Sequence, residues 1–207
     1  MKVNKQAVVS LMVIFFTILI MRAAVIADEK KQELSAEDQK IMEIYKKYAS
    51  PGESHKFLDY FVGKWESSQK IWMEPGKEPL TGKQEISVES LFEGRFTSAH
   101  IKTIGEVMGM TIEGIVITGY DNYKKQFVSI TFGTTGTEFF LMYGTLDNTG
   151  KIRTDTGYAD DVVTGERIKL KGVTTLINND TYTYEMFQTD PQGNEFKYME
   201  ITYTRKK

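Results

Sequence analysis

The sequence predicts an all-β protein: an up-and-down antiparallel β-barrel of about ten strands, preceded by one or two short helices. Two observations support this prediction. From residue 64 onward, short segments rich in Val, Ile, Thr, Tyr and Phe alternate with turn sequences such as Glu74-Pro75-Gly76. In addition, Gly63-Lys64-Trp65 begins the first segment and Arg205 lies near the end of the last. A contact between the two ends of a β-meander requires the sheet to close.

The turn sequences separate ten predicted strands. None of the segments between them is long enough for a helix that crosses between parallel strands, so neighbouring strands are expected to be antiparallel. The predicted strands are residues 65–73, 83–91, 95–104, 111–120, 125–132, 138–146, 151–158, 167–177, 181–189 and 195–205.

Alternation along the strands predicts which side chains face the interior. In the last strand, Met199, Ile201 and Tyr203 share a face with Arg205, so this face is expected to point inward. With Trp65 inside, the first strand also places Ser and Gln side chains inside. Buried hydroxyls and amides need hydrogen-bond partners, which water or a ligand can supply.

The strand number predicts a cavity. A barrel of eight strands is filled by side chains or holds one small ligand, and more strands enclose more space. We therefore expect ten strands to leave an internal cavity of ligand size, although side chains could also fill it. The residues predicted to bind a ligand there are Met73, Ile86, His100, Tyr184, Met186, Met199 and Tyr203.

The N-terminus has the pattern of an export signal. Lys2 and Lys5 precede an apolar run over residues 7–21, and Val25-Ile26-Ala27 supplies small residues before a cleavage point. Cleavage after Ala27 would give an exported, periplasmic or secreted protein without a stable membrane span. An uncleaved N-terminal anchor is the alternative. The expected organisation is a signal peptide at 1–27, a helical segment at 28–50 and the barrel domain at 51–207.

Two helical segments are expected before the barrel. Ser35 and Asp38 form a variant of the capping box, and the stripe of Ile41, Ile44, Tyr45 and Tyr48 is expected to pack on the surface of the same domain. After Ser50-Pro51-Gly52, a short turn over residues 53–61 offers Phe57, Leu58 and Phe61 to close one end of the barrel.

Several short motifs follow one another between Pro51 and Arg205. They are Pro51-Gly52 with His55-Lys56 and Leu58, Phe61-Val62-Gly63-Lys64-Trp65, Trp72-Met73-Glu74-Pro75-Gly76, Glu93-Gly94-Arg95-Phe96, Met108-Gly109-Met110, Gly119-Tyr120-Asp121-Asn122, Met199-Glu200-Ile201 and Tyr203-Thr204-Arg205. Together they resemble the bacterial domain-of-unknown-function 1579 family. The resemblance implies a lipocalin-like, calycin-type barrel in which Gly63, Trp65 and Arg205 form a structural latch.

Composition restricts the possible functions. The 207 residues carry a formal net charge of −2, which does not suggest nucleic acid as a partner. The chain has no Cys and only two His, His55 and His100, so a zinc site is not expected. Haem on His100 and copper on the Met108 and Met110 thioethers are weaker alternatives, and we expect no cofactor.

Motifs of enzymes are absent from the sequence, which has no Gly-x-Ser-x-Gly elbow and no phosphate-binding Gly-rich loop before a helix. The favoured hypothesis is an exported barrel that binds a small hydrophobic or amphipathic molecule in its cavity. The alternatives are an uncharacterised enzyme on a calycin barrel, with no assigned catalytic residue, and an envelope structural or interaction protein.

Overall fold

The structure is a computed structural model that describes residues 35–107, 109–162, 164–189 and 193–207. The predicted signal peptide at 1–27 and residues 28–34 lie outside the described residues. Two helices, α2 (Ala36–Ala49) and α3 (Glu53–Asp59), precede ten strands. The strands are β1 (Gly63–Ile71), β2 (Leu80–Leu91), β3 (Phe96–Thr103), β4 (Glu113–Asp121), β5 (Gln126–Gly133), β6 (Phe140–Leu146), β7 (Ile152–Asp160), β8 (Arg167–Asn178), β9 (Thr181–Thr189) and β10 (Glu195–Arg205).

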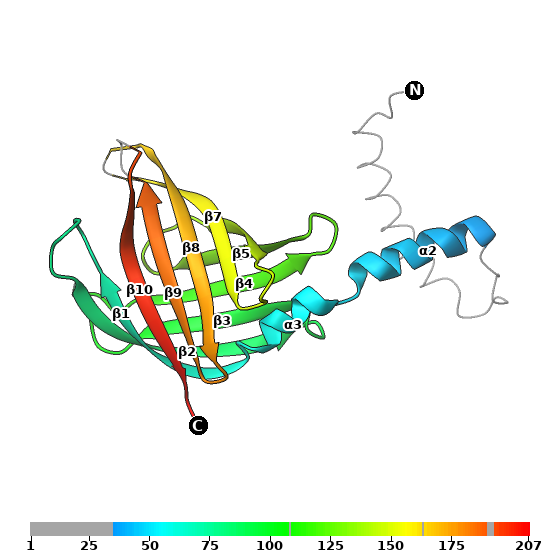
Figure 1. Ribbon diagram of the computed structural model, residues 1–207, viewed down its shortest axis with the longest axis horizontal. Helices are drawn as coiled ribbons and strands as arrows, with labels where there is room; N and C mark the ends of the chain where they lie inside the picture. Colours follow the sequence, from blue (N-terminus) through cyan, green and yellow to red (C-terminus); the bar gives the residue numbers. More distant parts are fainter. Residues whose placement is uncertain (1–34, 108, 163, 190–192) are drawn as a thin grey trace. The chain divides into compact units, whose positions relative to one another are not determined.

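The ten strands form a closed barrel in which each strand pairs with its neighbours in sequence and β1 pairs with β10 (Figure 1). All pairs are antiparallel, as the short turns between the strands require. The closing pair has Trp65 opposite Arg205 and Ile71 opposite Met199. The predicted all-β, up-and-down barrel is therefore confirmed.

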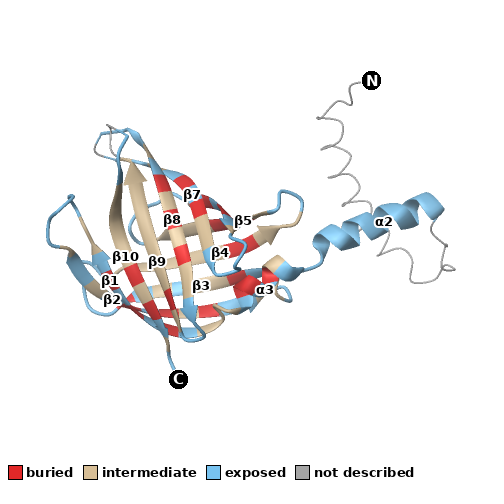
Figure 2. Cartoon of the chain, in the orientation of Figure 1, coloured by how far each residue is buried: buried red, intermediate tan, exposed pale blue. Residues whose placement is uncertain are grey.

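Burial alternates along the strands (Figure 2). In β1, Trp65, Ser67 and Gln69 are buried while the residues between them are exposed. The interior is partly polar, as expected, and the Ser67 hydroxyl donates a hydrogen bond to the Gln84 side chain over 3.3 Å. The pairing of β9 and β10 is interrupted between Lys197 and Met199, and this irregularity was not predicted.

Helix α3 closes one end of the barrel (Figure 1). Its buried residues are His55, Phe57 and Leu58. Phe57 and Leu58 pack with the fully buried Phe127 of β5, and the rings of Phe57 and Phe127 meet at 5.5 Å between centroids. The predicted plug at residues 53–61 is present because a short amphipathic turn presents its apolar side chains to the barrel.

The latch between Trp65 and Arg205 lies at this closed end. The Arg205 guanidinium sits over the indole of Trp65, with Cζ 4.1 Å from the ring centroid. It also donates hydrogen bonds to the carbonyls of Val62 and Tyr60 at 2.8 and 2.7 Å, and the Trp65 indole donates to the Phe61 carbonyl at 2.7 Å.

Gly63, the third member of the predicted latch, has φ +125°, a backbone conformation that favours glycine. A Cβ on Gly63 would lie 3.1 Å from an Nη atom of Arg205. The absence of a side chain at this position therefore lets the chain turn into β1 directly beside the guanidinium.

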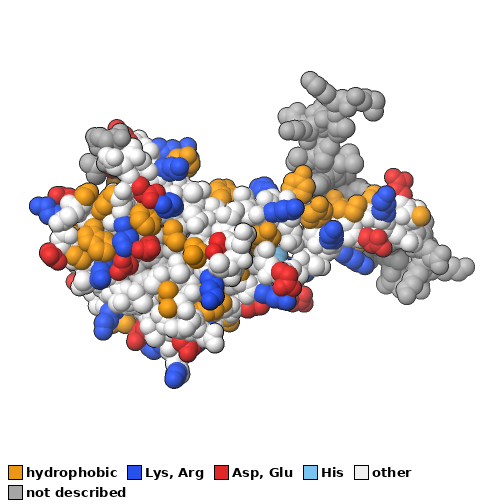
Figure 3. All heavy atoms as spheres, in the orientation of Figure 1, with side chains coloured by type: hydrophobic (Ala, Val, Ile, Leu, Met, Phe, Trp, Pro, Cys, Tyr) orange, Lys and Arg blue, Asp and Glu red, His pale blue; other side chains and the backbone are white. Residues whose placement is uncertain are grey.

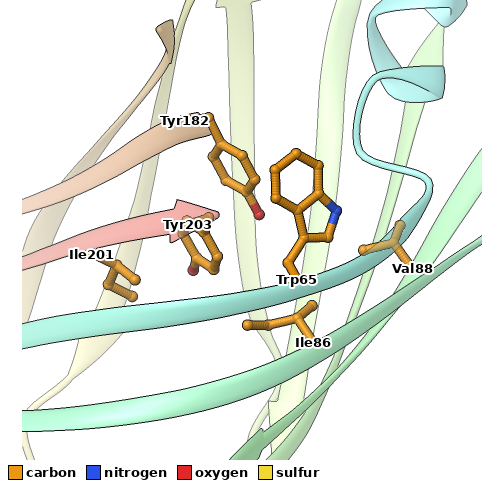
Figure 4. Close-up of a cluster of buried hydrophobic side chains, with 6 residues drawn as sticks. All are labelled: Trp65, Ile86, Val88, Tyr182, Ile201 and Tyr203. Atoms are coloured by element: carbon orange, nitrogen blue, oxygen red, sulfur yellow. The ribbon is translucent and has the colours of Figure 1, made fainter. Parts of the chain in front are cut away.

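Trp65 belongs to a buried cluster with Tyr182 and Tyr203 (Figure 4). The rings of Tyr182 and Tyr203 are stacked at 4.2 Å between centroids, and Tyr182 meets the Trp65 ring edge-on at 4.9 Å. Such aromatic pairs add about 0.5–1.5 kcal/mol each beyond the area they bury. The cluster therefore stiffens the barrel at the end closed by α3.

No residue of helix α2 is buried, and Ile41, Ile44, Tyr45 and Tyr48 are each about half exposed. The packing of this stripe on the domain stays a prediction. None of the described helices is long and apolar enough to cross a membrane. The outer surface in Figure 3 mixes basic, acidic and apolar side chains, without a continuous patch of one charge.

Candidate functional site

An internal cavity of about 300 Å³ lies within the barrel. Leu58 of α3 and Phe61 line it at the closed end, and the strands supply the remaining wall. The wall contains apolar, hydroxyl-bearing and amide side chains and one guanidinium: Gln84, Ile86, Val88, Thr97, Ala99, Ile101, Val116, Thr118, Thr131, Arg153, Tyr182, Tyr184, Met186, Met199, Ile201 and Tyr203. A cavity of this size is at the lower end of ligand pockets, which span roughly 300–1,000 Å³.

Five of the seven predicted binding residues line this cavity. They come from three strands, β2, β9 and β10: Ile86, Tyr184, Met186, Met199 and Tyr203. Whether they bind a ligand stays a prediction.

Two predicted binding residues lie elsewhere. Met73 follows the end of β1 and is 62% exposed, because the strand ends at Ile71 and its alternation does not extend into the turn. His100 is exposed on the outer face of β3, while its neighbours Ala99 and Ile101 line the cavity. Both residues are therefore removed from the candidate site.

The reason for the error at His100 is the composition of β3. Its inward face carries Thr97, Ala99 and Ile101, and its outward face begins with the bulky Phe96. Phe96 is 40% exposed and its ring meets that of Phe92 outside the barrel. Assigning the face with the larger apolar side chain to the interior therefore gives the wrong orientation for β3.

Sequence reasoning missed an ion pair inside the barrel. Arg153 and Asp155 lie two residues apart on β7 and so share its inward face. Arg153 Nε donates to Asp155 Oδ2 over 2.9 Å, with 11% and 2% of the side chains exposed. A second guanidinium nitrogen, Nη2, donates to the Ser129 hydroxyl at 3.2 Å.

The surroundings hold this guanidinium in place. Its Cζ lies 5.3 Å from the ring centroid of Phe127, and the Ser129 hydroxyl is hydrogen-bonded to that of Thr118 at 3.0 Å. Among the described residues that line the cavity, Arg153 is the only one with a formal charge. The cavity wall is thus mostly apolar and includes one fixed guanidinium, which is paired with the Asp155 carboxylate.

Two glycines make room for buried side chains: Gly144 for the Asp155 carboxylate and Gly172 for the Tyr184 phenol. Gly144 and Gly172 lie opposite Asp155 on the two neighbouring strands. A Cβ on Gly144 would be 2.0 Å from Asp155 Oδ1, and one on Gly172 would be 2.6 Å from the Tyr184 hydroxyl. Asp155 Oδ1 is buried and has no hydrogen-bond partner among the described residues.

Tyr184 and Tyr203 keep their protons in this environment. Burial raises the pKa of Tyr184, and the Asp155 carboxylate raises it further because a second negative charge nearby is unfavourable. Burial also raises the pKa of Tyr203. Both phenols therefore face the cavity as neutral groups that can donate a hydrogen bond.

The arrangement offers little for metal binding or for catalysis by histidine. Within the described ranges, no three His, Cys, Asp or Glu side chains are grouped closely enough to hold a metal ion. His55 is buried in α3, where its Nδ1 accepts a hydrogen bond from the Gly52 amide at 3.0 Å. Met108 of the considered copper pair lies outside the described residues.

A second hollow, of about 390 Å³, lies at the surface beside α3. Charged groups such as Glu53, Lys56 and Asp59 line it together with His55. The imidazole is already engaged with the backbone of the same turn, so this hollow offers no arranged set of groups toward a ligand.

Fold and cavity together define the class: a closed ten-stranded up-and-down β-barrel with one plugged end and an internal cavity. The chain belongs to the family described as "Protein of unknown function (DUF1579)", whose model matches residues 50–205. None of the curated proteins matches this sequence.

Solved structures resemble the barrel. The crystal structure of Rv2717c from M. tuberculosis has a TM-score of 0.54 at 13% identity, covering 76% of this chain and 100% of that one. A redesigned β-barrel has a TM-score of 0.36 at 11% identity, covering 77% and 100%. At this identity, the first likeness concerns the fold alone.

Proposed function

We propose that this protein is an exported binding protein that holds a small hydrophobic or amphipathic molecule in its barrel, without chemical turnover. The observation that supports the proposal is the cavity of about 300 Å³, lined mostly by apolar strand residues and, at the closed end, by Leu58 and Phe61. Burial of apolar ligand surface in such a space contributes about 25 cal/mol per Å² before the cost of association.

The first experiment looks for a natural ligand. Native mass spectrometry of the protein purified from its own host should show a retained mass that organic solvent removes. Mass measurement of the same material tests export, because cleavage after Ala27 gives a chain that begins at Asp28. An intact N-terminus would contradict cleavage and would support the alternative, a protein anchored by its N-terminal segment.

The second experiment fills the cavity. Ala99 lines the cavity and His100, the next residue on β3, is exposed outside, so Ala99→Phe and His100→Phe add bulk on opposite sides of one wall. We expect a fluorescent apolar probe to bind the natural protein and His100→Phe, and to bind Ala99→Phe at least tenfold more weakly. Equal binding by all three would overturn the proposal.

A further inference from the structure

We propose that the ligand is an anionic amphiphile with a short apolar chain, and that Arg153 binds its carboxylate inside the barrel. This inference rests on the proposed function and adds the chemical class of the ligand. Its basis is a cationic group fixed in the wall of a mostly apolar cavity.

The Arg153 guanidinium has hydrogen-bond donors that are not used within the described part of the chain. It carries five N–H groups, of which one bonds to Asp155 and one to Ser129. The other three have no acceptor among the described residues. Arg153 is part of the cavity wall whereas Asp155 is not. We take the guanidinium, and not the carboxylate, as the group that a ligand meets. An acceptor on the ligand would satisfy these donors.

Fixed geometry lowers the cost of binding an anion there. The bonds to Asp155 and Ser129 and the packing on Phe127 immobilise the Arg153 side chain before a ligand arrives. A preorganised donor spares the ligand the entropy of ordering a long side chain. The neutral Tyr184 hydroxyl also lines the cavity, and it has no hydrogen-bond partner among the described residues.

The position of Arg153 predicts the orientation of the ligand. Arg153 lies near the start of β7, at the end of the barrel closed by α3, and Phe127 beside it packs on Phe57 and Leu58 of that helix. Met186 and Met199 line the cavity further toward the opposite end of β9 and β10. The carboxylate would therefore lie deep in the barrel, with the chain pointing away from α3.

The cavity also limits the size of the ligand. At about 30 Å³ per water-sized group, 300 Å³ accommodates roughly ten non-hydrogen atoms, close to the ten carbons and two oxygens of decanoate. Decanoate is thus a suitable probe, with 1-decanol and decylammonium as probes of equal chain length and different charge. Calorimetric titration of the full chain near neutral pH, below the micelle concentrations, compares the three.

We expect decanoate to bind about tenfold or more tightly than 1-decanol, and decylammonium to bind weakest. The variant for this test combines Arg153→Met with Asp155→Asn. Both charges are removed together so that no buried carboxylate is left unpaired. This double variant should lose the preference for decanoate while keeping its affinity for 1-decanol within about threefold. Arg167→Met, which removes an exposed arginine from the outer face of β8, is the matched control and should change neither affinity.

The outcomes separate the two proposals. The proposed role of Arg153 is wrong, and the binding function stands, if 1-decanol binds and decanoate binds no tighter. The same conclusion follows if the double variant keeps the preference for decanoate. If none of the three probes binds, and no ligand is retained from the host, the proposed function itself fails. The comparison of the three probes on the natural protein needs no variant, so a double variant that does not fold still leaves the inference testable.

Discussion

Arg205 lies with its guanidinium over the indole ring of Trp65, 4.1 Å from the ring centroid, and so joins the last strand of the barrel to the first. The same side chain caps the carbonyls of Tyr60 and Val62 in the segment that leads from α3 into β1. One residue near the end of the chain thus fastens the last strand both to the first strand and to the segment that precedes it.

We predict that Arg205→Ala lowers the free energy of unfolding by about 2–4 kcal/mol. The variant loses a cation–π contact and leaves two partly buried carbonyls without their charged donor. Arg205→Lys keeps the charge but lacks the planar fork, so an intermediate loss is expected. Urea unfolding followed by Trp fluorescence measures both, and unchanged stability of Arg205→Ala would show that the latch is not structural.

Much of the fold could be predicted because its signals are local. Turn residues and alternating burial repeat every few residues, so each strand is recognisable by itself, and β9 and β10 occupy the predicted ranges. The error at Met73 came from extending this alternation beyond the end of β1. The irregularity at Lys197 depends on pairing with β9 and leaves no comparable mark in the sequence.

The ion pair in the cavity depends on contacts that are distant in sequence. Arg153-Thr154-Asp155 alone reads as a charged segment, and charged residues on strands mostly face solvent. Gly144, opposite Asp155 on β6, leaves room for its carboxylate, and that pairing is known only once the register of the two strands is known. A glycine across the sheet from an inward-facing charge would have been the signal.

Gly144 is predicted to be essential for this packing. In Gly144→Ala the new Cβ would lie 2.0 Å from Asp155 Oδ1, so the buried carboxylate and its ion pair must shift. We expect a loss of about 1–3 kcal/mol, as for other overpacked cores. Gly52→Ala is the control, because Gly52 has φ −124° and no heavy atom within 4 Å of an added Cβ. Denaturant unfolding compares the two, and a Gly144→Ala protein as stable as the natural one would contradict the prediction.

His55 is expected to make stability depend on pH. Burial, and then the positive charge of Arg95, lower the pKa of His55 below its usual value of 6.5. From about pH 6.5 down to the lowered pKa, the unfolded chain binds a proton that the folded one does not, so stability falls as the pH falls. Above about pH 6.5 this contribution is complete and constant.

Substitution of the histidine tests this expectation. In His55→Gln the fall in stability below about pH 6.5 should be smaller than in the natural protein, since the titrating group is gone. His100→Gln removes the exposed imidazole of β3 and is the matched control. Unfolding in urea at a series of pH values gives the slopes, and equal slopes in His55→Gln and the natural protein would refute the role of His55.

The tyrosines of the barrel predict the opposite dependence at alkaline pH. Burial raises the pKa of Tyr182, Tyr184, Tyr198 and Tyr203 above the ordinary value of about 10, that of Tyr198 to about 12. Because the folded pKa is the higher one, their contribution to stability is fully present below pH 10 and is lost as the pH rises beyond it. Phenolate absorbance should therefore show a group of tyrosines that ionises only when circular dichroism reports unfolding, whereas in concentrated urea all should ionise near pH 10. Ionisation of all eleven tyrosines near pH 10 in a protein that keeps its native circular dichroism would mean that water reaches these phenols inside the barrel.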